Sequence, residues 1–143
     1  MTTTAEDILT ILNEAGFGDR RVILFTPADK GAYDNRPLTV VASEARTSED
    51  LDVTVQADRS AVNLLFSGQY GPNGEASVEA FARKVYKYIR NSGEAPYCIL
   101  DKVVNGHTYL CIKARHPPSH EGYDQDGRTV YSFEIDIYRV TED

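Results

Sequence analysis

The sequence has little of what several common protein classes require. Its 143 residues contain no tryptophan, one methionine and two cysteines. It also lacks an excess of positive charge, since 15 basic residues stand against 22 acidic ones and give a formal net charge of −7. Binding to nucleic-acid phosphates needs Lys and Arg to displace counterions, so this balance argues against a nucleic-acid-binding protein. It favours an acidic surface that serves solubility.

Long apolar segments are missing as well. No apolar run approaches the roughly 20 residues that a membrane-spanning helix needs. Residues 1–7 carry neither the basic segment nor the apolar core of a signal peptide, so we expect a protein made in the cytoplasm. The chain is 41% hydrophobic, and its length suits one globular domain over residues 1–143.

The two cysteines indicate neither a disulfide framework nor a zinc site. Cys98 and Cys111 fall in two strand-like segments joined by Asn105-Gly106, a strong hairpin signal. In that hairpin Leu100 faces Cys111, which makes the cysteines diagonal neighbours and not a direct pair. We therefore expect both thiols to stay reduced.

Periodicity divides the chain into helices and strands. Apolar residues at helical spacing predict helices over 4–15 and 75–91, the first capped by Thr3 or Thr4. Alternating and β-branched runs predict strands over 21–26, 38–42, 51–56, 61–67, 97–104, 107–114 and 128–140. Because helices and strands segregate, the pattern predicts an α+β fold: a mixed, mainly antiparallel β-sheet with two helices packed on one face.

The last strand gives the clearest alternation. From Tyr131 to Tyr138 apolar and polar residues alternate strictly, which predicts one buried face and one polar face. The polar face carries Glu134 and Asp136 without a catalytic partner. We take it as a candidate acidic strand face for contact or solvation.

Each pattern that resembles a reactive site fails on local grounds. His116 and His120 lie four residues apart, but the two prolines between them forbid the helix that would align their imidazoles. Residues 124–127 lack the later ligands of a calcium loop. The glycines at 68, 71 and 74 lack the spacing of a phosphate-binding loop. We therefore expect no catalytic, cofactor-binding or metal-binding residues, and a protein that is not an enzyme.

Two loops and one helix face remain as candidates for contacts. The polar segment 43–50 is interpreted as a hairpin loop or a mobile flap, and the Pro/His/Gly-rich segment 116–127 as a docking arm. Their candidate contact residues are Ser43, Glu44, Arg46, Glu49, Asp50, His116, His120, Tyr123, Asp124, Asp126 and Arg128. The basic side of the second helix either is solvated or attracts phosphate or an acidic partner; it comprises Arg83, Lys84, Lys87 and Arg90.

The whole chain resembles the tail terminator proteins of long-tailed bacteriophages, also called minor capsid or tail completion proteins. Three segments carry the resemblance. The first is strand 21–27, which leads into a loop with Gly31 and Tyr33. The second is strand 61–68 followed by the amphipathic helix 77–89. The third is the Asp-x-x-Gly-Arg turn at 124–128 followed by the alternating last strand.

The resemblance implies a tail-terminator-like α+β domain that forms a homohexameric ring. Such a ring caps the tail tube, ends its polymerisation and joins the tail to the head connector. The implied partners are further copies of the chain, the major tail tube protein and head–tail connector proteins, with genomic DNA passing through the centre without sequence-specific binding. The implied location is the head-proximal end of the virion tail, after assembly in the host cytoplasm, with no cofactor and no membrane.

Two other interpretations stay open. Another head–tail adaptor or connector ring protein would differ only in its docking partner. A small α+β ligand-binding domain would instead build a pocket from the Gly-rich turn 68–74 and the 116–127 loop. The extra strand pair predicted at 38–42 and 51–56 departs from the family pattern and leaves open which strands would line a ring.

Overall fold

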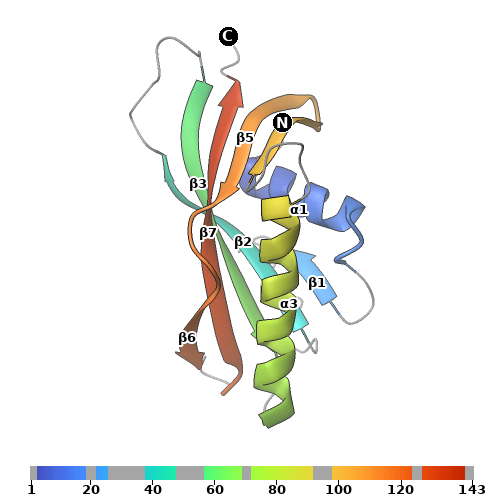
Figure 1. The fold of residues 1–143 in the computed structure, drawn as a ribbon, viewed down its shortest axis with the longest axis vertical. Helices are drawn as coiled ribbons and strands as arrows, with labels where there is room; N and C mark the ends of the chain where they lie inside the picture. Colours follow the sequence, from blue (N-terminus) through green and yellow to red (C-terminus); the bar gives the residue numbers. More distant parts are fainter. Residues whose placement is uncertain are drawn as a thin grey trace.

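The computed structural model shows one mixed β-sheet with two helices on the same side of it (Figure 1). It describes residues 3–18, 22–25, 38–47, 57–68, 72–91, 98–123 and 127–140. The helices are α1 (Thr4–Glu14) and α3 (Pro72–Asn91). The strands are β1 (Val22–Phe25), β2 (Leu38–Thr47), β3 (Ala57–Gly68), β4 (Cys98–Val104), β5 (His107–Ala114), β6 (Ser119–Tyr123) and β7 (Thr129–Val140). The predicted α+β class is confirmed.

The last strand of the chain lies in the interior of the sheet. The strand order is β1-β2-β3-β7-β5-β4, and only the β1–β2 pair is parallel. One edge of β7 pairs with β3 along its whole length, and the other edge pairs with β5 and then with β6. At about 3.4 Å per residue β7 is roughly 40 Å long, so two shorter strands fit end to end along it.

Helix α1 begins where the sequence predicts. Thr3 is the N-cap, and its side-chain oxygen accepts a hydrogen bond from the Glu6 N–H at 3.2 Å. This contact satisfies one of the backbone donors that a helix start leaves unpaired. Ile8, Ile11 and Leu12 form the buried stripe, and the helix ends before Gly16, which has a φ of +89°.

The core lies between the helices and the sheet. On β7 the side chains that alternate toward the helices, Phe133, Ile135 and Ile137, are fully buried, which confirms the predicted buried face. The register sets them opposite Leu64, Val62 and Ser60 of β3. Helix α3 covers them with Val78, Ala82, Val85 and Ile89. Phe81, which the same periodicity predicts in the core, is partly buried at its edge.

The predicted hairpin around Asn105-Gly106 is present. Both turn residues have positive φ, +50° and +82°, which matches the twist of the two flanking strands. The register pairs Leu100 with Cys111, as the sequence predicts. Cys111 is a half-buried residue in the reduced thiol form.

The structure corrects two segments that the sequence predicts as loops. Residues 43–47 continue β2 in antiparallel pairing with β3, so they are not a hairpin loop or flap. Residues 119–123 form β6, so the segment 116–127 is not a loop throughout. Both segments are polar in sequence and lack the apolar alternation from which strands are predicted, and the side chains of β6 are mostly exposed. Residues 27–37, 48–50 and the predicted strand 51–56 lie outside the described residues.

Candidate functional site

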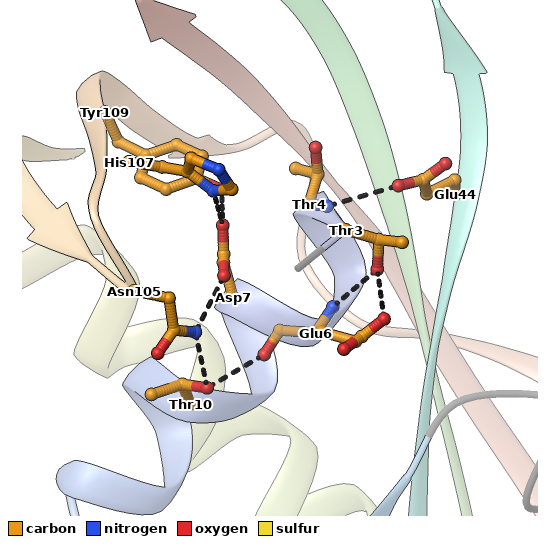
Figure 2. Close-up of polar contacts among 9 residues, drawn as sticks. All are labelled: Thr3, Thr4, Glu6, Asp7, Thr10, Glu44, Asn105, His107 and Tyr109. Atoms are coloured by element: carbon orange, nitrogen blue, oxygen red, sulfur yellow. Dashed lines mark hydrogen bonds and ion pairs between the residues drawn. The ribbon is translucent and has the colours of Figure 1, made fainter. Parts of the chain in front are cut away.

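A buried carboxylate joins α1 to the β4–β5 hairpin (Figure 2). Asp7 is fully buried, and its Oδ2 lies 2.8 Å from His107 Nδ1 and accepts a hydrogen bond from the Tyr109 hydroxyl. Its other oxygen, Oδ1, accepts from Asn105 Nδ2 at 2.8 Å. The Asn105 amide also donates to Thr10 Oγ1 at 3.2 Å, one turn further along α1. We call these residues the Asp7 cluster.

From the sequence alone, Asp7 is only a possible capping partner of Thr4 at the start of the helix. It lies in the first helical turn, where an acidic residue is favoured by the helix dipole. Its partners are 98 to 102 residues away in the sequence, so no local pattern brings them together. The usable signal is the pair His107 and Tyr109, which share one strand face directly after the turn at Asn105.

The acidic, imidazole and phenol groups of the Asp7 cluster are buried and hydrogen-bonded to one another. Burial raises the pKa of Tyr109 above its ordinary value, and the hydrogen bond to Asp7 raises it further, while Arg139 acts in the opposite direction. Asp7 and Tyr109 are 0% exposed and His107 is 4% exposed, so a substrate has no access to the three reactive groups in this conformation. The geometry therefore supports a contact that fixes α1 on the sheet, not a reaction centre.

We predict that alkaline pH destabilises the protein through Tyr109. The folded-state pKa is raised above the ordinary 10.0, so the unfolded chain loses the phenolic proton first and stability falls as pH rises above that value. Urea unfolding between about pH 8 and pH 11 should show this decline, with a shallower slope in Tyr109→Phe. Equal slopes in the two proteins would contradict the assignment.

The structure places the first candidate docking segment beside α1. Glu44 is exposed, and its Oε1 accepts a hydrogen bond from the Thr4 N–H at 3.2 Å, so it helps to cap the helix. Ser43 is half-buried in β2. Arg46 follows a bulge in β2. Glu49, Asp50, Asp124 and Asp126 lie outside the described residues.

Arg128 is not an exposed docking residue, contrary to the sequence-based prediction. Its side chain is buried, with 7% of the residue exposed. The guanidinium donates to the carbonyl oxygens of Gly68 at 3.3 Å and Ser67 at 3.4 Å. A guanidinium carries five donors, so it satisfies the backbone acceptors at the end of β3 just where β7 begins.

The β6 strand presents an aromatic group to solvent. The His120 ring lies against the rings of Tyr123 and Tyr131, with centroids 5.4 and 5.0 Å apart. Tyr131 is buried, whereas Tyr123 is 64% exposed. His116, just before β6, contacts the Pro117 carbonyl oxygen at 2.8 Å through Nδ1. Three of the candidate docking residues, His116, His120 and Tyr123, therefore lie on β6 or shortly before it.

The candidate acidic strand face contains a cation that sequence reasoning missed. Arg115 donates to Glu134 Oε2 at 2.6 Å and to Asp136 Oδ1 at 2.7 Å. Next to them Glu121 Oε1 accepts from the hydroxyls of Ser132 at 2.6 Å and Ser119 at 3.0 Å. These two hydrogen bonds lower the pKa of Glu121, which keeps it charged.

The basic side of α3 is only partly paired. Arg83 forms an ion pair with Glu79 one turn earlier at 3.1 Å, and Arg90 donates to the Tyr86 hydroxyl at 3.0 Å. Lys84 and Lys87 are exposed, and neither forms an ion pair within the described part of the chain.

A scan against protein-family models and a search of curated proteins both return no match for this chain. Neither described helix is long and apolar enough to cross a membrane. Within the described ranges, no three His, Cys, Asp or Glu residues are grouped closely enough to hold a metal ion.

Proposed function

We propose that the protein is a phage tail terminator: a ring that caps the tail tube, ends its polymerisation and joins the tail to the head connector. It acts as a homohexamer at the head-proximal end of the tail. Its partners are the major tail tube protein on one side and a connector protein on the other. The resemblance of residues 21–27, 61–89 and 122–135 to that family supplies the idea, and the α+β sheet with two helices is compatible with it.

One observation carries the proposal. The described residues leave two large hydrophobic side chains well exposed, Val103 at 65% and Tyr123 at 64%. Val103 belongs to the β4–β5 hairpin and Tyr123 ends β6, and these elements lie toward opposite ends of the long axis (Figure 1). A ring component between a tube and a connector needs one contact surface at each end, and aromatic residues such as Tyr123 are enriched in protein interfaces.

The ligand-binding alternative receives less support. Its pocket needs the segment 116–127 as a wall or lid, but residues 119–123 pair with β7 as a strand. The other predicted wall is the Gly-rich turn 68–74. Its first residue, Gly68, pairs with Thr129 of β7 and so belongs to the sheet. A different head–tail adaptor ring uses the same surfaces and is distinguished by which protein binds each end.

Mixing experiments with the tube protein encoded in the same genome test the proposal. We expect the full chain to bind the ends of tail tubes as a six-membered ring in electron micrographs and to stop further growth. Tyr123→Ala or Val103→Ala should each weaken one end contact while leaving the monomer folded, because both side chains are exposed. Lys102→Ala is the matched control on β4. Unimpeded tube growth with the wild-type chain would contradict the proposal.

A further inference from the structure

We infer that Lys84 and Lys87 of one copy bind Glu121 and Glu134 of a second copy, so that identical subunits associate face to opposite face. The inference rests on the proposed ring and names the contact between its neighbours. It involves α3 and the sheet face that points away from α3, whereas the exposed Val103 and Tyr123 belong to the β4–β5 hairpin and to the last residue of β6.

The donors lie on the outer face of α3. Four of the chain's 15 basic residues fall between Arg83 and Arg90, in a protein whose net charge is −7. Two of them have internal partners, since Arg83 pairs with Glu79 and Arg90 with Tyr86. Lys84 and Lys87 are exposed one turn apart, so their ammonium groups point from one side of the helix. The inner side of α3 is occupied by core residues such as Val85.

The acceptors lie on the opposite face of the sheet. Glu134 alternates with Phe133 and Ile135, which face the helices, so its carboxylate points away from α3. Glu121 is bound by Ser132, which shares the face of Glu134. Within the described residues, Glu121 uses only Oε1 and Glu134 only Oε2, so each keeps one oxygen available for a further donor.

The local charges fix these acceptors in place. Arg115 bridges Glu134 and Asp136, and Lys113 lies opposite Asp136 in the register. This surface therefore combines three carboxylates with two cations, and the carboxylates are held before a partner arrives. A held acceptor loses less conformational entropy on binding than a mobile one.

The spacings of the two pairs are compatible. Lys84 and Lys87 are separated by about 4.5 Å of rise along α3. Ser132, which binds Glu121, and Glu134 are separated by roughly 7 Å along β7. Because the donor and acceptor surfaces differ, each copy offers one of each to its neighbours. Such a heterologous contact closes into a ring when the rotation between copies permits.

Charge reversal with complementation tests the inference. Variant one is Lys84→Glu with Lys87→Glu, and variant two is Glu121→Lys with Glu134→Lys. Sedimentation velocity over a range of protein and salt concentrations measures association, and circular dichroism checks that each variant is folded. We expect wild-type association to weaken with salt, and each variant alone to associate more than about tenfold more weakly. Lys102→Glu, a charge reversal on β4, is the control and should associate as the wild type does.

The mixture of the two variants gives the sharpest result. The intact acidic surface of variant one binds the intact basic surface of variant two, and the two reversed surfaces again carry opposite charges. The mixture should therefore recover association, including rings in which the two variants alternate. If both charge-reversal variants associate as strongly as the wild type, the inference is overturned, while the ring itself stays supported. A wild-type protein that stays monomeric at low salt would also overturn it, and the tube-capping experiment would then decide the proposed function separately.

Discussion

Replacing Asp7 by alanine is expected to lower the free energy of unfolding by about 3–5 kcal/mol. The carboxylate is fully buried and accepts from His107, Tyr109 and Asn105. Its removal leaves an imidazole and a phenol in a site that water does not reach. An unsatisfied buried donor costs about 1–3 kcal/mol, so losing the shared acceptor of several donors falls among the largest single-residue effects.

Chemical unfolding in urea measures this loss, with Glu14→Ala as the control. Glu14 is an exposed acidic residue of the same helix, so its replacement should change stability by less than about 0.5 kcal/mol. Asp7→Asn adds a test of charge, because the amide keeps the size of the side chain and one acceptor oxygen. A loss below about 1 kcal/mol in Asp7→Ala would mean that the Asp7 cluster does not fix α1 to the sheet.

The second large effect is expected in the aromatic core, where Phe66→Ala should cost about 3–5 kcal/mol. Phe66 is fully buried in β3, and its ring stacks on Phe133 with centroids 5.6 Å apart. It also meets the edge of Phe81 at 6.0 Å. Truncation removes these contacts and leaves a cavity between the sheet and α3 that the surrounding strands cannot close.

Phe81→Ala is the matched comparison, because Phe81 is the other partner in one ring contact of Phe66 and the substitution removes the same kind of side chain. Phe81 is only partly buried, so its loss should be clearly smaller than that of Phe66. Urea midpoints and slopes for the two variants measure the difference. Equal losses would show that the edge of the helix layer is as well packed as its centre.

Local chemistry predicted much of the fold. Helical spacing located α1 and α3, the Asn105-Gly106 turn located the β4–β5 hairpin, and alternation located the buried face of β7. These features follow from the 3.6-residue period of a helix and the two-residue period of a strand, and both periods can be recognised in a short segment of sequence. Polar strands without such a period, β6 and the second half of β2, were not predicted.

The candidate site was harder to predict from the sequence than the fold. Arg128 was taken as a candidate docking residue, yet its side chain is buried and donates to carbonyl oxygens at the end of β3. Glu134 and Asp136 were placed on the correct face, but Arg115 was missed. It enters that face only because β5 pairs beside β7.

The sequence by itself determined the types of most elements, the faces they bury, the hairpin and the acidic balance of the chain. Only the tertiary structure decided that β7 takes three neighbours, that β6 pairs at all, and that Asp7 meets residues about a hundred positions away. The physical reason is the separation along the sequence over which each effect acts. Periodicity and turn chemistry act between residues a few positions apart, whereas the choice of partner depends on which distant surfaces bury apolar area and satisfy polar groups together.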